Sequence, residues 1–290
     1  MSYRIETGEG LADAFGRIAA EEIGVAMAEL RRRDHGEAIH NARKALKRLR
    51  ALLRSLRVAF PDKWFRAENQ RIAAAGRKMS PLRDVRVQLR ALANLGPVGS
   101  AGKRVSRLLL RRQTAFSRRI PALRKTVRQM LRLSGQNIAA RPASKATPRD
   151  LARSLKRIYQ QGRDAFKTAC RRPSPENLHE WRKKVKSLEY GFELIKRLGL
   201  HKTSRMLKSA AALSEALGDD HDLFMVETAL ARENRSRPAP DYRSLAKRIC
   251  ARRAKLQKKS LKLGALIYAE KPGRFRKQLD RCLRRTATSR

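Results

Sequence analysis

Residues 39–49 read IHNARKALKRL, and residues 178–188 read LHEWRKKVKSL. Each stretch carries a histidine, two basic residues three and four positions later, and a lysine seven positions later. The chain holds only five histidines, and two of them lead the same pattern. His40 and His179 are separated by 179 − 40 = 139 residues. The pattern therefore predicts an internal repeat.

A second pair of landmarks supports the repeat. SPLRDVRV at 80–87 aligns with GDDHDLFM at 218–225 through Asp84 and Asp222, with an offset of 222 − 84 = 138 residues. Two landmarks with nearly one offset predict duplicated halves, each a bundle of about four helices. Acids that follow a glycine, such as those after Gly218, are typical of helix caps.

The fold class follows from periodicity. Apolar residues recur every 3.5 or 3.6 positions over long segments, and strand-like alternation is nearly absent, which predicts an all-α protein. Thr147-Pro148 and Ser174-Pro175 are typical helix starts. The break at 134–149 lies near the middle of the chain and is the best boundary. We therefore predict an N-terminal helical half at 1–135, a linker at 136–147 and a C-terminal helical half at 148–290.

The repeated helix has an apolar seam beside a basic stripe. In the first copy, the predicted seam comprises Ile39, Ala42, Leu46, Leu49, Leu53, Leu56 and Phe60. One residue further along the chain, and so about 100° around the helix, the stripe comprises His40, Arg43, Lys47, Arg50, Arg54 and Arg57. The second copy has the seam Leu178, Trp181, Val185, Leu188, Phe192 and Ile195 and the stripe His179, Arg182 and Lys186. That stripe changes sign at Glu189 and Glu193, which we expect to hold nearby Lys or Arg side chains.

The charge balance indicates a polyanionic partner. The chain carries 70 Lys and Arg against 26 Asp and Glu, a formal net charge of +44. Nucleic acid, an anionic membrane surface and a phosphate polymer are the candidate partners. Further basic stripes follow helical spacing at Arg104, Arg107 and Arg111, at Arg153 and Lys156, and at Arg252, Lys255, Lys259 and Lys262. Like charges at this spacing destabilise a helix unless an anion neutralises them.

Several functional classes find no support in the sequence. The three cysteines are scattered and lack metal-ligand spacing, which argues against a zinc module and suits a reducing cytoplasm. We expect neither a signal peptide nor a transmembrane helix, and hence no stable membrane insertion. No nucleophile and base arrangement, G-x-S-x-G motif or P-loop is present, so we predict no catalytic residues and no cofactor. Asp219, Asp220, His221 and Asp222 could ligate a metal, but we favour helix caps and predict no metal site.

Several segments resemble the CHAD (conserved histidine α-helical domain) family. Both histidine-led helices look like the two leading helices of that family, and the GEGLADAF at 8–15 looks like its opening. The LRD at 82–84 and the LGDDHDL at 217–223 look like its paired acidic turns, so the resemblance implies a turn at each. The resemblance covers about residues 9 to 285. It implies two four-helix bundles related by a pseudo-twofold, with a basic groove or cavity between them that binds inorganic polyphosphate without catalysis. It also implies a cytoplasmic location at polyphosphate granules. The binding residues we predict are His40, Arg43, Lys44, Lys47, Arg50, Arg54, Arg104, Arg107, Arg111, Arg153, Lys156, His179, Arg182, Lys183 and Lys186.

Nonspecific nucleic-acid binding is the main alternative, because dense positive charge binds any phosphate backbone. Against it, aromatic residues make up only 5% of the chain and several lie on core seams, so stacking platforms for bases are scarce. A membrane-surface role ranks third, since the helices need their apolar seams for one another. An accessory role in a metal-dependent phosphohydrolase is more distant still.

Overall fold

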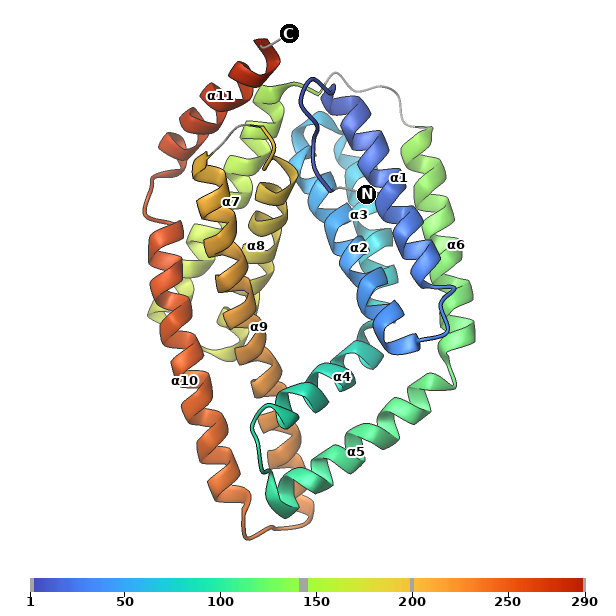
Figure 1. The fold of residues 1–290 in the computed structure, drawn as a ribbon, viewed down its shortest axis with the longest axis vertical. Coiled ribbons are helices and arrows are strands. Elements are labelled where there is room, and N and C mark those ends of the chain that lie inside the picture. Colours follow the sequence, from blue (N-terminus) through green and yellow to red (C-terminus); the bar gives the residue numbers. More distant parts are fainter. Residues whose placement is uncertain (1–2, 141–145, 199–200, 289–290) are drawn as a thin grey trace.

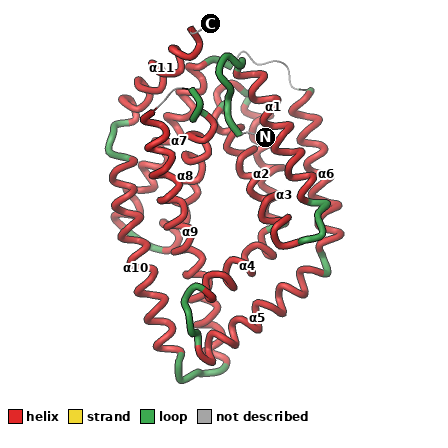
Figure 2. Tube along the Cα trace, in the orientation of Figure 1, coloured by secondary structure: helices red, strands yellow, loops and turns green. Residues whose placement is uncertain are grey.

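The structure, a computed structural model, describes residues 3–140, 146–198 and 201–288, with residues 35, 201–203 and 284–288 as backbone only. Every regular element in these ranges is a helix, which confirms the all-α prediction (Figures 1 and 2). The α-helices are α1 (Leu11–Glu29), α2 (His35–Ser55), α3 (Asp62–Lys78), α4 (Ser80–Ala93), α5 (Gly99–Ser117), α6 (Ile120–Ala139), α7 (Pro148–Arg171), α8 (Pro175–Leu194), α9 (His201–Ser236), α10 (Tyr242–Ile267) and α11 (Pro272–Thr288). A short 3-10 helix, η1 (Arg57–Ala59), follows α2.

Two columns of helices stand side by side in Figure 1. In the first column, α1 packs on α2, α2 on α3, α3 on α6 and α6 on α1, which makes a ring of four helices. In the second column, α7 packs on α8 and α11, while α9 packs on α8 and α10. α4 and α5 leave the first column and pack against α9, so they close the lower end of the molecule (Figure 1).

The hydrophobic cores do not follow the boundary between the predicted halves. The larger core combines residues of both, such as Leu49 of α2 with Leu155 of α7 and Leu188 of α8. The smaller core joins Val105 of α5 to Val226 of α9. α2 and α5 each pack on helices of the other half, so the halves share their cores rather than folding as two self-contained bundles.

The predicted seams are confirmed. All seven seam residues of α2 and its extension, and all six of the second copy, are at most 6% exposed. The basic stripes therefore flank buried surface, as the one-residue offset predicted. The start of α7 is also confirmed: Thr147 and Asp150 form a capping box around Pro148. At the other end of the predicted linker, α6 runs to Ala139, so residues 136–139 are helical rather than linker.

The two acidic segments are not turns, and this expectation was wrong. Asp84 lies in the second turn of α4, and Asp222 lies inside α9, which runs without a break for 36 residues. The acids after Gly218 were expected to cap a new helix, but a helix interior tolerates glycine at a cost of about 1 kcal/mol, and α9 continues through this residue.

Candidate polyanion-binding site

Five basic side chains from three helices converge where α2 faces α8. We call them the central basic cluster: Arg43 and Lys47 of α2, Arg83 of α4, and Arg182 and Lys186 of α8. The other four members are the charges that act most strongly on Lys47. The structure thus brings the Arg and Lys of both motif copies together, although they lie about 139 positions apart in sequence.

Local contacts hold the two motif arginines in equivalent places. Arg43 Nη1 donates hydrogen bonds to Ser80 Oγ, at 2.7 Å, and to the carbonyl oxygen of Gly76. Gly218 occupies the position that aligns with Ser80, and the Arg182 guanidinium lies against it. A Cβ atom at Gly218 would sit only 3.3 Å from Arg182 Nη2. Glycine in the middle of α9 therefore leaves room for a site arginine.

Two aspartates neutralise only part of this charge. Arg83 Nη1 lies 3.3 Å from Asp84 Oδ1 and 3.7 Å from Asp222 Oδ1, so it links α4 to α9. Asp84 also acts on Arg43 and Asp222 on Arg182, which repeats the same pairing in each half. Glu189 pairs with Lys186 in addition, so five cations face three carboxylates, and the cluster keeps a net positive charge.

The net positive charge of the cluster affects the pKa of Lys47. Burial, followed by the charges of Arg182 and the other cluster members, lowers the pKa of Lys47 to about 7. Burial also lowers the pKa values of Arg43 and Arg182. The Nε atoms of both arginines are buried and lack a hydrogen-bond partner among the described residues. An unpaired buried donor costs free energy, and an anion bound nearby would offset the positive charge of both guanidinium groups.

The motif histidines lie at the edge of the cluster as neutral rings. Burial and then Arg83 lower the pKa of His40. His179 stacks on His221 of α9 with ring centroids 4.4 Å apart. Burial and His221 lower the pKa of His179 to about 4. Both imidazoles are therefore biased towards the neutral form, with burial as the largest cause.

A cavity of about 310 Å³ adjoins the cluster between α2, α7 and α8. Its cationic lining comprises Lys47, Arg50, Arg54, Arg182, Lys183, Lys184 and Lys186. Most of the predicted binding residues on α2 and α8 therefore lie in the cluster or this cavity. His40, Lys44 and His179 lie outside this lining.

The other predicted residues lie elsewhere. Arg104, Arg107 and Arg111 line a separate cavity of about 300 Å³ between α5 and the end of α9. On α7, Arg153 is exposed beside Asp150, and neither it nor Lys156 lines the cavity between α2, α7 and α8. Periodicity identified these stripes as basic, but it could not say which stripes face one another.

Sequence reasoning missed one member of the cluster, Arg83. The sequence contains a feature that could have identified Arg83. This residue precedes the landmark Asp84 and aligns with His221, which precedes Asp222. The pairing of Arg83 with both aspartates shows why the position matters. Lys184 was likewise omitted although it lines the cavity.

The acidic segment of α9 has structural partners. Asp220 is buried and accepts hydrogen bonds from Arg253 Nε and Gln257 Nε2 of α10. Within the described part of the chain, no three His, Cys, Asp or Glu residues are grouped so that they could hold a metal ion. None of the described helices has the length and hydropathy to span a bilayer.

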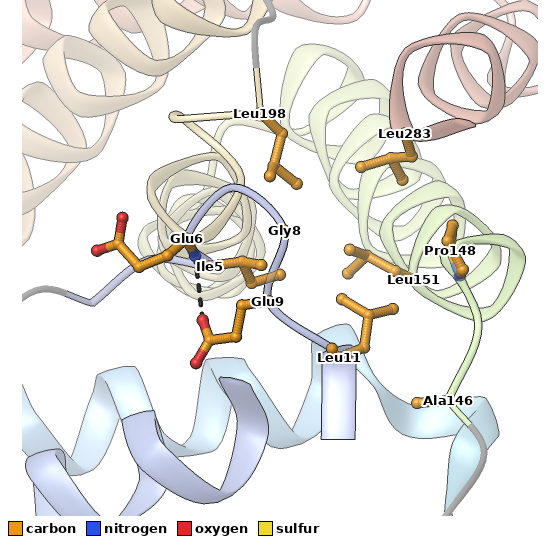
Figure 3. Close-up of a pocket in the computed structure, with 11 residues that line it drawn as sticks. Ile5, Glu6, Gly8, Glu9, Leu11, Ala146, Pro148, Leu151, Leu198 and Leu283 are labelled. Atoms are coloured by element: carbon orange, nitrogen blue, oxygen red, sulfur yellow. Dashed lines mark hydrogen bonds between the residues drawn. The ribbon is translucent and has the colours of Figure 1, made fainter. Parts of the chain in front are cut away.

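A further cavity, of about 260 Å³, lies at the upper end of the molecule between the N-terminal segment, α7 and α11 (Figure 3). Its walls are largely apolar, with Leu151 and Leu283 among them, and its charged residues are Glu6 and Glu9. Arg17 pairs with Glu9 and Arg197 with Glu6. This acidic, apolar site does not suit a polyanion.

Asp222 is expected to stabilise the unliganded protein by offsetting repulsion within the cluster. Asp222→Asn should lower the free energy of unfolding by about 1 to 3 kcal/mol, and a bound polyanion should reduce that loss by supplying the missing charge. The measurement is thermal unfolding with and without long-chain polyphosphate.

Asp219→Asn is the matched control for Asp222→Asn. Burial, Glu215 and Asp222 already raise the pKa of Asp219, so removing its charge should not destabilise the fold. A similar loss from both variants would contradict this role for Asp222.

Comparisons with known proteins agree with this architecture. The CHAD domain family matches residues 9–232, and the chain belongs to this family. The crystal structure of the CHAD domain from the plant Ricinus communis is similar, with 19% identity and a TM-score of 0.63 over 93% of this chain and 96% of that one. PptA from Streptomyces chartreusis is also similar, with 17% identity and a TM-score of 0.60 over 91% of this chain and 98% of that one. These identities support a shared fold alone. No curated protein matches the sequence.

Proposed function

We propose that this protein binds inorganic polyphosphate through the central basic cluster and the adjoining cavity, and that it does so without catalysis. The observation that carries the proposal is the convergence of Arg43, Lys47 and Arg83 with the second-copy Arg182 and Lys186. A phosphate polymer is a slim, base-free chain of closely spaced negative charges. It can therefore reach cations that lie between packed helices, and it needs no aromatic platform.

Binding draws on two physical terms. Arg and Lys donate charge-assisted hydrogen bonds to phosphate oxygens, and the ligand releases its condensed counterions. The unpartnered Nε atoms of Arg43 and Arg182 favour the first term. The proposal gives no residue a catalytic role, because Asp84 and Asp222 are engaged with arginines. The same ligand would place the protein at polyphosphate granules in the cytoplasm.

A competition experiment tests the ligand. Labelled long-chain polyphosphate is bound to the protein at physiological salt, and unlabelled polyphosphate, DNA or RNA is added at matched total charge. We expect nucleic acid to compete at least about 10-fold less well than polyphosphate, because duplexes and stacked strands cannot enter the cluster. Equal or better competition by a nucleic acid would instead support nonspecific nucleic-acid binding. Release of orthophosphate during the incubation would contradict binding without catalysis.

A further inference from the structure

The pseudo-twofold relation between α2 and α8 is visible in two equivalent contacts. Arg54 Nη1 donates to Ser187 Oγ at 2.8 Å, and Arg48 pairs with Glu193. With the offset of 139 residues, Arg54 aligns with Glu193 and Arg48 aligns with Ser187. The same contact thus occurs once on each side of Lys47 and Lys186. The pseudo-twofold therefore gives the central basic cluster two equivalent sides, one at each contact, from which a ligand could approach. The cavity of about 310 Å³ lies on the first side, and Tyr3 packs over Arg48 on the second, with 5.3 Å between Arg48 Cζ and the ring centroid.

The first approach, which we call the cationic mouth, consists of Arg50, Arg54, Lys183 and Lys184. Arg50 donates to the side-chain oxygen of Asn69, and Arg54 donates to Ser187. Both partners are uncharged, so neither arginine is neutralised. Burial and Arg50 lower the pKa of Arg54 to about 10. The one acid in the adjoining cavity, Glu180, is paired with Lys183.

The second approach, which we call the acidic mouth, consists of Glu22, Lys44, Arg48, Glu189 and Glu193. Glu189 and Glu193 occupy the positions that align with Arg50 and Arg54 of the cationic mouth. Arg48 is held by Glu193 and lies 3.6 Å from Glu22. Glu189 binds the Lys186 ammonium at 2.8 and 2.9 Å, on the side of the cluster where the second motif copy changes sign.

The two mouths differ in charge at equivalent positions. Two arginines on one side stand opposite two glutamates in the equivalent places on the other, a difference of four unit charges. A polyanion entering through the acidic mouth would meet carboxylates, and it would compete with Glu189 for Lys186. Through the cationic mouth it would meet Arg50, Arg54 and Lys184, for which no acidic partner is seen among the described residues, and Lys183, which is paired with Glu180.

We propose that the phosphate chain enters and leaves the central basic cluster through the cationic mouth alone, while Glu189 and Glu193 close the acidic mouth to it. This inference rests on the proposed function, and it makes the protein a one-sided receptor rather than a tunnel through which the chain threads. Overhanging phosphates then extend from the cationic mouth only. Glu189 and Glu193 act as specificity-determining residues that set the direction of the bound chain.

Entry through the cationic mouth alone can be tested by comparing three lysines of the same molecule. Lys183 of the cationic mouth aligns with Lys44 of the acidic mouth, and both are exposed. Lys47 lies between them in the cluster. The experiment measures acetylation of each lysine by mass spectrometry, with and without long-chain polyphosphate. We expect protection of Lys47, about fivefold or greater protection of Lys183, and less than about twofold protection of Lys44.

The outcomes separate the two proposals. No protection of Lys47 would overturn the proposed function itself. Protection of Lys47 with equal protection of Lys44 and Lys183 would leave the function standing and overturn the single mouth. Protection of Lys44 but not of Lys183 would also overturn the proposed entry through the cationic mouth.

A gain-of-access variant provides a second test. Glu189→Arg with Glu193→Arg gives the acidic mouth the residues of the cationic one, and Lys44 should then become protected by polyphosphate to about the level of Lys183. Circular dichroism verifies the fold, and Glu189→Gln replaces the double variant should that one not fold. With Glu189→Gln, Lys44 protection should rise above its wild-type level. Unchanged exposure of Lys44 in a folded variant would contradict the gating role of the glutamates.

Discussion

Reversing Arg43 and Lys47 to Glu together is expected to weaken long-chain polyphosphate binding by at least about 100-fold at physiological salt. Each lost charge-assisted hydrogen bond accounts for about 1.5 to 3 kcal/mol, and 1.4 kcal/mol corresponds to tenfold in affinity. The new carboxylates would also repel the ligand at its closest approach. The dissociation constant is measured by isothermal titration or by fluorescence anisotropy.

The matched control is Arg243→Glu with Lys247→Glu. This pair has the same residue types, the same four-residue spacing and the same change in net charge, but it lies exposed on α10. We expect it to weaken binding by less than about threefold, because exposed charges beyond a Debye length are largely screened. Equal losses from the two variants would show that total charge alone governs binding, and the central basic cluster would lose its special role.

The sequence predicted the parts of the site that depend on local periodicity. The seam of α2 and the seam of α8 are set by steps of three and four residues, and each stripe lies about 100° from its seam. Because the repeat relates the two helices, the sequence also indicated that His40 and His179 lead equivalent stripes. The structure confirms both seams and gathers the motif arginines and lysines.

Tertiary packing decided what the sequence left open. The acids after Gly218 were expected to cap a new helix, yet α9 continues through this glycine, and Arg182 packs closely against it. Arg83 joins the cluster because α4 crosses to α9, and no short-range pattern encodes that crossing. The stripe at Arg104 has the same spacing as that at Arg43, but it faces the end of α9 instead. Spacing identifies a face of a helix, whereas packing determines what that face meets.

The role of Glu189 and Glu193, where the charge of the stripe changes sign, was predicted only in part from the sequence. The sequence predicted that these acids hold neighbouring basic side chains, and Glu189 does bind Lys186 while Glu193 binds Arg48. Their position on one approach to the cluster could not be predicted, because it depends on how α2 and α8 cross.

The affinity for polyphosphate is expected to fall as pH rises above 7, approaching about tenfold per pH unit. The pKa of Lys47 is lowered to about 7 in the free protein by burial and by four neighbouring cations. A bound phosphate chain offsets those charges and raises this pKa towards its ordinary value, so the complex holds one more proton above pH 7. Affinity is therefore highest below pH 7, where Lys47 is already protonated, and is lost as pH rises through that value.

The motif histidines are the other groups that could take up this proton, since a bound phosphate chain would favour their charged form. The structure favours Lys47, because His179 would need to rise from a pKa of about 4 before it could be protonated near neutral pH. Titration at pH 8 in buffers of different ionisation enthalpy counts the protons taken up on binding. We expect nearly one proton for the wild type and nearly none for Lys47→Arg, since arginine keeps its charge at this pH. His40→Gln with His179→Gln should leave the count unchanged. If the histidine variant abolishes the uptake while Lys47→Arg retains it, the imidazoles contact the ligand and Lys47 is not the titrating group.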